Sequence, residues 1–356
     1  MERKLEAVAE AVRPLDAALG VAAQARLDDL TKPKGSLGRL EDFARRIYMI
    51  QEGPDAVKAD PARIYTIAGD HGVTAEGVSL FPQEVTRQMV ANFLNGGAGI
   101  NVLARTVGAE LYVVDAGSCG GEYEAHPNLI QAKVAPGTAS LAEGPAMTRE
   151  QCLEALLLGV RLADEAHVAG IRTLGTGDMG ISNTTPSTAL YCAYLGFDPE
   201  EITGPGTGLD RDGVRNKINV IRRGLEANRK IVESGDPLAV LAALGGFEIA
   251  ALAGLILGGA RNRQVVCVDG FISTAAYCAA RAICPLVSEY CFVSHASAEP
   301  GHEAVTAKLE QEPLLHLGFR LGEGTGAACA FFLLRSACDI FNEMATFSEA
   351  GVDSGA

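Results

Sequence analysis

Several short segments of this chain place a single carboxylate among glycines. Gly322-Glu323-Gly324-Thr325-Gly326 does so for a glutamate, and Gly177-Asp178-Met179-Gly180 does so for an aspartate. Glycines let the ring of a ligand approach the backbone while the carboxylate points at it. A carboxylate in a partly apolar slot can remove a proton as a general base. For Glu323 the alternative is an acid that caps the last helix and interacts with its dipole, and the pattern alone favours neither.

Binding of a phosphate is indicated by Asn183-Thr184-Thr185. These residues offer hydroxyls and free backbone N–H groups at a predicted helix start, which suits one phosphate group. The alternative is a helix cap without a ligand. Lys217, on the helix predicted to begin near Asp212, is the nearby cation, although a lone lysine on a helix is more often a solvated surface charge.

A dinucleotide fingerprint, G-x-G-x-x-G, is present at Gly175, Gly177 and Gly180, after a predicted strand and before a predicted helix. A dinucleotide-binding unit also needs a second strand about 20 residues on that ends in an acid. Residues 196–201 form a predicted turn at that place. An NAD-dependent oxidoreductase is therefore the weaker interpretation.

Two histidines and two glutamates lie together in residues 294–303. Their types would suit a metal, but their spacing matches no zinc-binding helix pattern and Pro300 interrupts the segment. We expect structural or substrate-contacting roles for His295 and His302, and no metal.

The elements that must position these residues alternate between strand and helix. Short β-rich runs at 64–67, 111–114, 171–174, 265–268 and 290–293 each end in a loop with glycine, an acid or a hydroxyl. This alternation predicts an α/β fold with a doubly wound, largely parallel sheet flanked by helices. Ligands bind at the carboxyl ends of such strands. The shared edge of five such loops therefore predicts a site.

The two chain ends are predicted to be helical. Leu5, Val8, Val12, Leu15 and Leu19 recur at helical spacing and predict one helix. A second follows over 40–50, and 327–345 forms a strongly apolar final helix. We expect a small helical domain from residues 1–60 with 325–350, and a large nucleotide- and base-binding α/β domain from 61–324.

Composition excludes several classes of partner. A net charge of −14, with no local run of lysine or arginine, disfavours nucleic acid and anionic membranes. Nine cysteines, an odd number without C-x-x-C spacing, favour a reducing, cytoplasmic setting. Residues 238–260 are long and apolar enough to span a bilayer, but Glu248 lies near their centre, so a buried helix is expected.

Taken together, the motifs resemble one family. In order along the chain they are T-K-P-x-G-S-L-G-R-L-E at 31–41, A-G-D-H-G-V at 68–73, P-Q-E-V-T-x-Q-M at 82–89, D-M-G-I-x-N-T-T at 178–185, G-x-G-T-G at 204–208, G-G-F-E-I-A-A-L-A-G at 245–254, D-G-F-I at 269–272, S-H-x-S-A-E-x-G-H at 294–302 and L-G-E-G-x-G-A at 321–327. The chain is therefore similar to the nicotinate-nucleotide–dimethylbenzimidazole phosphoribosyltransferases.

The resemblance implies a reaction and an assembly. The family moves the 5-phosphoribosyl group of nicotinate mononucleotide to 5,6-dimethylbenzimidazole or a related aromatic base, with inversion at C1′. The products are α-ribazole 5′-phosphate and nicotinate, used in cobalamin or cobamide nucleotide-loop assembly. The resemblance also implies a homodimer whose small helical domain comes from both chain ends. No cofactor is expected.

Site residues follow from the same resemblance, position by position. Glu323 corresponds to the general base. The chemistry of the reaction, rather than the resemblance, suggests that Asp178 meets charge that builds on the ribose. The base-binding residues would be Ser79, Phe81, Gln88, Met179 and Leu321, the last within the run 317–321. The residues around the ribose phosphate would be Gly180, Asn183, Thr184, Gly206, Lys217 and Ser297.

Three positions depart from the family pattern. Asp178 stands where glutamate is expected, Ser182 where glycine is expected, and Phe81 where tyrosine is expected. All three lie in segments expected to contact ligands, so they leave the natural base open: another benzimidazole, adenine or a phenol are alternatives. A non-catalytic nucleotide-binding protein is the remaining alternative from a different class.

Overall fold

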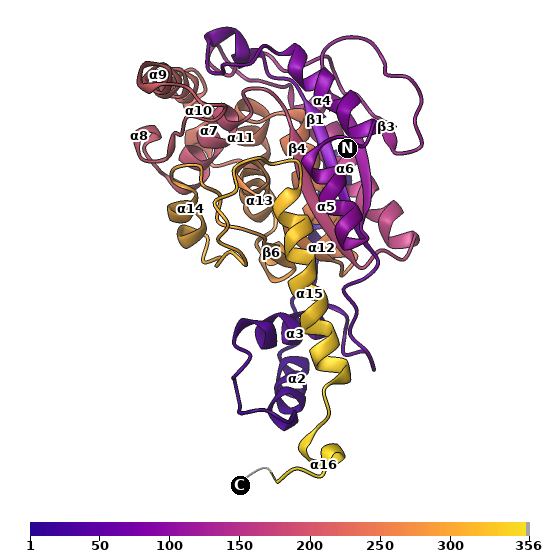
Figure 1. The fold of residues 1–356 in the computed structure, drawn as a ribbon. Helices are drawn as coiled ribbons and strands as arrows, with labels where there is room; N and C mark the ends of the chain where they lie inside the picture. Colours follow the sequence, from indigo (N-terminus) through magenta and orange to yellow (C-terminus); the bar gives the residue numbers. More distant parts are fainter. Residues whose placement is uncertain (354–356) are drawn as a thin grey trace.

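The computed structural model describes residues 1–353 and is built around a six-stranded parallel sheet. Its strand order is β3-β2-β1-β4-β5-β6 (Figure 1). The strands are β1 (Ala62–Gly69), β2 (Glu110–Gly117), β3 (Leu129–Gln131), β4 (Thr173–Met179), β5 (Val265–Val268) and β6 (Cys291–Val293). The chain winds outward in both directions from β1 and β4, so the topological switch point, where such sheets bind ligands, lies between these two strands.

The predicted fold class is confirmed, and all five predicted strands are present. The sixth strand, β3, was missed because its three residues are too few to show a periodic pattern.

Helices cover both faces of the sheet. Leu174 of β4 faces Gly259 of α12 (Phe247–Arg261), whereas its neighbour Gly175 faces Ala327 and Phe331 of α15 (Thr325–Glu343). Because successive side chains of a strand point to opposite faces, α12 and α15 lie on opposite sides of the sheet. With α15 lie α4 (Glu84–Leu94) and α5 (Gly99–Val107), and with α12 lie α6 (Arg149–Val168) and α13 (Phe271–Ile283).

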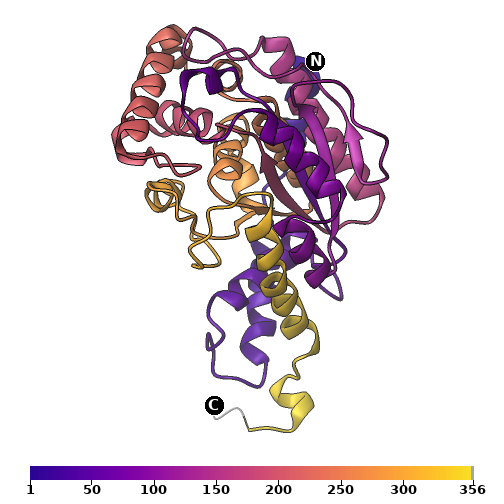
Figure 2. The same cartoon turned by 45° about the horizontal axis from the view of Figure 1, so that its top comes forward.

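The peripheral helices surround the loops that follow β4. They are α7 (Thr184–Leu195), α8 (Pro199–Ile202), α9 (Arg211–Ala227), α10 (Arg229–Ser234), α11 (Pro237–Leu244) and α14 (His302–Lys308), whereas the 3-10 turn η1 (Gly72–Glu76) follows β1 and the 3-10 turn η2 (Pro285–Glu289) precedes β6 and packs against α12 and α13. In Figure 2 these helices gather on one side of the body, opposite the strand edge that carries β3.

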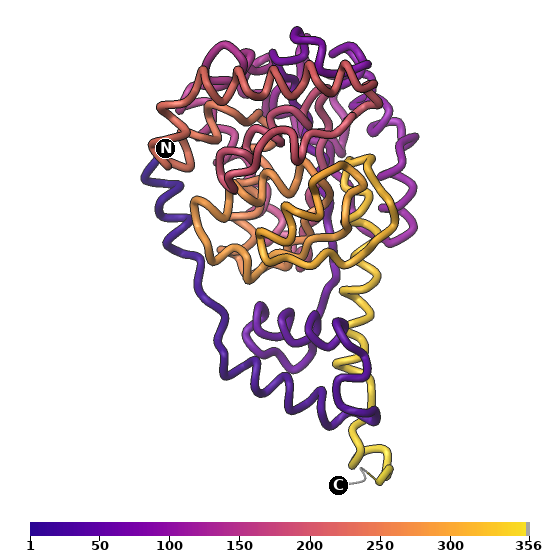
Figure 3. Tube along the Cα trace, turned by 90° about the vertical axis from the view of Figure 1, so that its left-hand side faces the viewer, coloured from indigo at the N-terminus to yellow at the C-terminus, as the bar shows by residue number. Residues whose placement is uncertain are grey.

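A small helical body projects from the sheet domain. It contains α2 (Ala17–Asp29), α3 (Arg39–Ile50) and the C-terminal part of α15, followed by α16 (Phe347–Ala350), and α15 packs against α3 as predicted for the final helix (Figure 1). Arg26 of α2 donates to the Phe341 carbonyl of α15 at 2.7 Å. Helix α1 (Glu2–Ala11) instead packs on α6 and α12, and the chain then runs down to α2 (Figure 3). The division into residues 1–60 with 325–350 and 61–324 stays a prediction.

One helix prediction was wrong. The helical spacing from Leu5 to Leu19 predicted a single helix, but residues 12–16 interrupt it between α1 and α2. Pro14 lies in this interruption, and the Asp16 side chain accepts a hydrogen bond from the Ala18 N–H at 2.8 Å to start α2. Proline removes a helix hydrogen bond and aspartate is a favoured cap, so the break follows from both.

The apolar stretch 238–260 is helical and buried, as expected. It divides at Gly245 and Gly246 into α11 and α12, and α12 is buried from Phe247 to Ala260. None of the helices within residues 1–353 is both long and apolar enough to cross a membrane. The N-terminus of α12 reaches the carboxyl ends of the strands, which places Glu248 at the edge where the candidate site lies.

Candidate active site

A cavity of about 280 Å³ opens beside the switch point, at the ends of β4, β5 and β6. Most of the predicted residues lie around it. Ten of them form part of its lining: Ser79, Phe81, Asp178, Met179, Gly180, Asn183, Thr184, Gly206, Ser297 and Leu321. The sequence motifs therefore converge on one hollow although they span more than two hundred residues.

Three predicted residues do not line the cavity. Glu323 is buried directly after Gly322, which is part of the lining. Lys217 is fully buried behind Gly206 and Thr184. Gln88 is exposed on α4 and is not part of this wall, so its role in base binding stays a prediction.

Asp178, the penultimate residue of β4, lies at the acidic end of the cavity. Asn183 donates to one of its carboxyl oxygens at 2.9 Å, and the other has no hydrogen-bond partner among the described residues. Burial, assisted by the nearby carboxylates of Asp269, Glu248 and Glu323, raises the pKa of Asp178 to about 8. The group therefore exchanges its proton near neutral pH, which an ordinary aspartate does not do.

Glu323 lies beside Asp178 on the turn that leads into α15. Its backbone is left-handed, with φ of 65°, which is unfavourable for a side chain other than glycine. The turn is held because Thr66 of β1 donates to the Glu323 carbonyl at 2.7 Å. Its carboxylate accepts from the Ile100 N–H at 3.3 Å, and burial raises the pKa of the carboxyl above its usual value. A carboxylate with raised proton affinity is a stronger base.

Asp269 fixes the start of α15, and with it Glu323. Its two oxygens accept from the backbone N–H groups of Gly324 at 3.0 Å, Gly326 at 2.8 Å and Ala327 at 3.1 Å. The predicted capping role at this helix start thus belongs to Asp269, because the Glu323 side chain points to the N-terminus of α5 instead. Glu323 is left for other chemistry.

Lys217 forms the cationic end. Its ammonium group donates to the Thr184 hydroxyl at 2.6 Å and to the Gly204 carbonyl at 3.3 Å. A methyl group at Gly206 would lie 3.2 Å from this ammonium, so only the Gly206 backbone separates the ammonium from the cavity. Burial lowers the pKa of Lys217 to about 8, against an opposing effect of Glu299. The general expectation of a solvated surface lysine was wrong here, because α9 turns this residue inward.

Further polar residues in the wall were not among the predicted site residues. Thr207 accepts from the Leu80 N–H at 3.1 Å, and Arg320 donates to the Gly206 carbonyl at 3.1 Å. Glu299 also lines the cavity, with one buried carboxyl oxygen unpaired among the described residues. Arg320 directly precedes the L-G-E-G segment. Its position beside that motif could have identified it as a site residue from the sequence.

The three departures from the family pattern all lie in the cavity wall. Ser182 has φ of 75°, which explains why glycine is the expected residue there. The Ser182 hydroxyl accepts a hydrogen bond from the Thr74 hydroxyl at 3.0 Å, which offsets part of the free-energy cost of this backbone conformation. Phe81 is half exposed at the mouth, where a hydroxyl could be added without a clash with the core.

The dinucleotide interpretation is not supported by the backbone. Gly175 and Gly177 lie inside β4 rather than in the turn after it, where that fingerprint needs them. Gly175 makes room for Ile64 and Phe331, and Gly177 makes room for the backbone of Glu323. These glycines therefore allow close packing against α15.

The two histidines differ in their surroundings: His295 lines the cavity, whereas His302 lies behind its wall. His302 accepts from the Ser297 N–H at 3.0 Å and contacts the Thr274 hydroxyl at 3.1 Å, and burial lowers its pKa to about 3. It therefore positions Ser297 in the cavity wall as a neutral ring. Across residues 1–353, no group of three or more His, Cys, Asp or Glu side chains is arranged to hold a metal ion.

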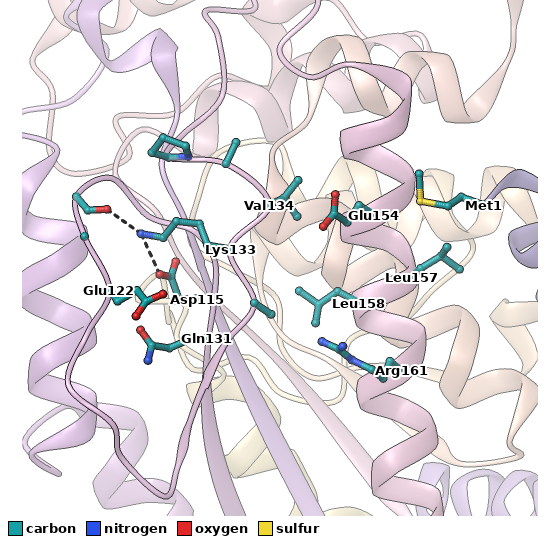
Figure 4. Close-up of a pocket in the computed structure, with 15 residues that line it drawn as sticks. Met1, Asp115, Glu122, Gln131, Lys133, Val134, Glu154, Leu157, Leu158 and Arg161 are labelled. Atoms are coloured by element: carbon teal, nitrogen blue, oxygen red, sulfur yellow. Dashed lines mark hydrogen bonds and ion pairs between the residues drawn. The ribbon is translucent and has the colours of Figure 1, made fainter.

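A larger cavity, of about 760 Å³, lies away from these residues, between α6 and the loop around β3 (Figure 4). Lys133 and Asp115 are paired there at 3.2 Å, and Lys133 also donates to the Gly120 carbonyl at 3.1 Å. Glu154, Leu157, Leu158 and Arg161 line the other side from α6. Because the buried Asp115 carboxylate is already paired with Lys133, it is not available as an acid or base in this cavity.

Known proteins have similar sequences and the same fold. A family model described as phosphoribosyltransferase matches residues 12–352. The nicotinate-nucleotide–dimethylbenzimidazole phosphoribosyltransferase of Nitratidesulfovibrio vulgaris is 65% identical over 99% of both chains, and that of Geotalea uraniireducens is 52% identical over 98% of both. The crystal structure of CobT from Thermus thermophilus matches with a TM-score of 0.89 and 44% identity, covering 95% of this chain and 100% of that one. The chain belongs to the nicotinate-nucleotide–dimethylbenzimidazole phosphoribosyltransferase family.

Proposed function

We propose that this chain transfers the 5-phosphoribosyl group of nicotinate mononucleotide to 5,6-dimethylbenzimidazole or a closely related base. The observation that carries the proposal is the division of one cavity into two charged ends. Two carboxyls of raised pKa, Asp178 and Glu323, lie at one end. The Lys217 ammonium lies at the other, under Thr184 and Gly206.

The chemistry needs little besides position and one base. Nicotinate leaves from a positively charged N-glycosidic bond, so it is a good leaving group without protonation. The incoming base nitrogen attacks C1′ from the opposite side, which forms the α bond as the β bond breaks. Glu323 accepts the proton carried by the other ring nitrogen of the base, which becomes acidic as the attacking nitrogen forms its bond to C1′, a contribution of about 10²–10⁴-fold in rate. Alignment of the two substrates supplies much of the remaining acceleration.

The other residues have roles that match their ends of the cavity. In its ionised form, which is the minor form below a pH of about 8, Asp178 meets the positive charge that develops on the ribose. Lys217 supports the phosphate through the Thr184 turn at the start of α7, with Asn183, Gly180 and Ser297 around it. Phe81, Met179 and Leu321 give the base an apolar slot with Ser79 at its rim. Gln88 is proposed for the base on motif grounds.

The assembly and location are also part of the proposal. Leu80, Phe81, Leu317 and Leu321 are exposed apolar side chains in the segments at the cavity mouth, and a second copy of the chain would cover them. We infer a homodimer, which sedimentation of the purified protein measures. All nine cysteines are free, which suits a reducing cytoplasm.

A product assay tests the reaction. Purified protein is incubated with nicotinate mononucleotide and, separately, dimethylbenzimidazole, benzimidazole, adenine or p-cresol, without added metal, and products are identified by chromatography and mass spectrometry. Release of nicotinate together with a matching riboside phosphate is expected, and relative rates rank the bases. Nucleotide binding without consumption of any base would instead favour a binding protein.

A further inference from the structure

A buried ion pair at the switch point has no part in the chemistry above. His71 follows the end of β1, and Glu248 lies in the first turn of α12. The His71 Nε2 and Glu248 Oε1 atoms are 2.7 Å apart, and the two side chains are 1% and 0% exposed. The second oxygen of Glu248 has no hydrogen-bond partner among the described residues. Ion pairs so deeply buried are costly to desolvate and are weak devices for stability, so their placement calls for another explanation.

Glycines on three elements close around this pair. A methyl group at Gly180 would lie 3.2 Å from His71 Nε2 and 3.3 Å from Glu248 Oε1. A methyl group at Gly69 would lie 2.6 Å from the second Glu248 oxygen, and one at Gly246 would overlap the His71 ring. Gly180 lines the cavity. The ion pair therefore packs directly behind the cavity wall, with only Gly180 between the pair and the cavity.

The same short wall has further contacts. The Ile181 N–H donates to the Thr86 hydroxyl of α4 at 3.1 Å, and Thr74 donates to the Ser182 hydroxyl at 3.0 Å. The segment from Asp178 to Ser182 is therefore held by Thr86 and Thr74 as well as by the His71–Glu248 pair.

The pair also sets the charge at this edge. Burial opposes a charge on His71, but the carboxylates of Glu248 and Asp70 prevail and raise its pKa. Asp178 in turn faces the carboxylates of Asp269, Glu248 and Glu323. The raised pKa of His71 favours a positive charge on its ring, within a group of buried acids at the ends of β1, β4 and β5 and at the starts of α12 and α15.

We propose that His71 and Glu248 are positioning residues for phosphoribosyl transfer: together they hold the Asp178–Ser182 wall and fix the net charge that Asp178 faces. The inference rests on the proposed function of the cavity. Neither residue touches substrate. A neutral total charge for the pair leaves Asp178 able to exchange its proton near neutral pH, and removal of one partner unbalances it.

The pH dependence of transfer in three variants tests this role. His71→Gln keeps a hydrogen-bond donor but leaves the Glu248 charge unbalanced, so the acidic limb of the kcat/KM profile should move up by about one pH unit. Glu248→Gln removes one of the carboxylates that raise the pKa of Asp178, so the limb should move down. We expect each single variant to lose about tenfold or more in kcat/KM near pH 7. The double variant, with no net charge change, should regain a limb close to that of the wild type.

Asp115→Asn is the matched control. Asp115 is a buried carboxylate paired with a cation at the end of the neighbouring strand, outside the candidate site, and its variant should keep the wild-type limb. An unchanged limb in all three His71 and Glu248 variants, with only their unfolding temperature lowered, would overturn the positioning role. If His71→Gln does not fold, the positioning role is tested by Glu248→Gln alone, through the direction in which the acidic limb of its kcat/KM profile moves. Absence of transfer in the wild-type protein would overturn the proposed function, and the inference with it.

Discussion

The two ends of the cavity handle buried charge in opposite ways. At the acidic end, carboxyls from β4, β5, α12 and α15 are crowded together, and burial raises the pKa values of Asp178 and Glu323. At the cationic end, a single ammonium from Lys217 has a hydroxyl and a carbonyl as partners. Crowded carboxyls of raised pKa suit proton transfer, whereas one ammonium behind backbone and hydroxyl groups suits an anion. The difference predicts that variants at one end change the chemical step and variants at the other change binding.

The largest effect is expected at the acidic end. Glu323→Gln keeps the shape of the side chain but cannot accept a proton, so kcat should fall by about 10²–10⁴-fold. The dissociation constant of nicotinate mononucleotide, measured by calorimetry, should stay within about twofold of the wild type because no binding contact is lost. Full activity in this variant would remove Glu323 from the mechanism.

The cationic end should show the reverse pattern. Lys217→Met fills the same buried space without a charge, so the dissociation constant of the nucleotide should rise by about 10–100-fold through loss of a charge-assisted contact. The single-turnover rate at saturating nucleotide should fall much less. A variant that binds the nucleotide normally but turns over slowly would contradict the division between the two ends.

Asp178 offers a test through stability. Its pKa is raised from 3.8 to about 8 in the folded chain. A carboxyl with a raised folded pKa favours folding at low pH, and this contribution is lost as the pH rises through about 8. In Asp178→Asn this side chain does not titrate. The unfolding temperature of the variant minus that of the wild type should therefore increase by several degrees as the pH rises from 5 to 9. A difference that is the same at every pH would mean that Asp178 is not buried as a neutral acid.

The smallest effect is expected at the mouth. Phe81 is 50% exposed there, and Phe81→Tyr restores the residue expected from the family pattern. Because the added hydroxyl contacts only the rim, the ratio of rates with dimethylbenzimidazole and adenine should change by about two- to fivefold. The competition between the two bases in one reaction measures this ratio. No change in the ratio would place the base elsewhere than beside Phe81.

The sequence was sufficient for the sheet and for most of the cavity wall, but not for burial. Strands rich in β-branched residues, most of them followed by a glycine-rich loop, placed the carboxylates on one edge. The inward direction of Lys217 depends on how α9 packs, and the pairing of His71 with Glu248 joins residues far apart in the chain. Such long-range contacts leave no periodic trace in the sequence, and neither did the three-residue strand β3.

Stereochemistry at C1′ tests the central claim most directly. Transfer in a single displacement, with Glu323 as the base and no covalent intermediate, requires that the β-configured nucleotide give an α-configured product. Nuclear magnetic resonance of the riboside phosphate formed from nicotinate mononucleotide and dimethylbenzimidazole reports this configuration. The account predicts the α anomer alone. A β anomer would mean a double displacement through a covalent intermediate, and would contradict the role given to Glu323.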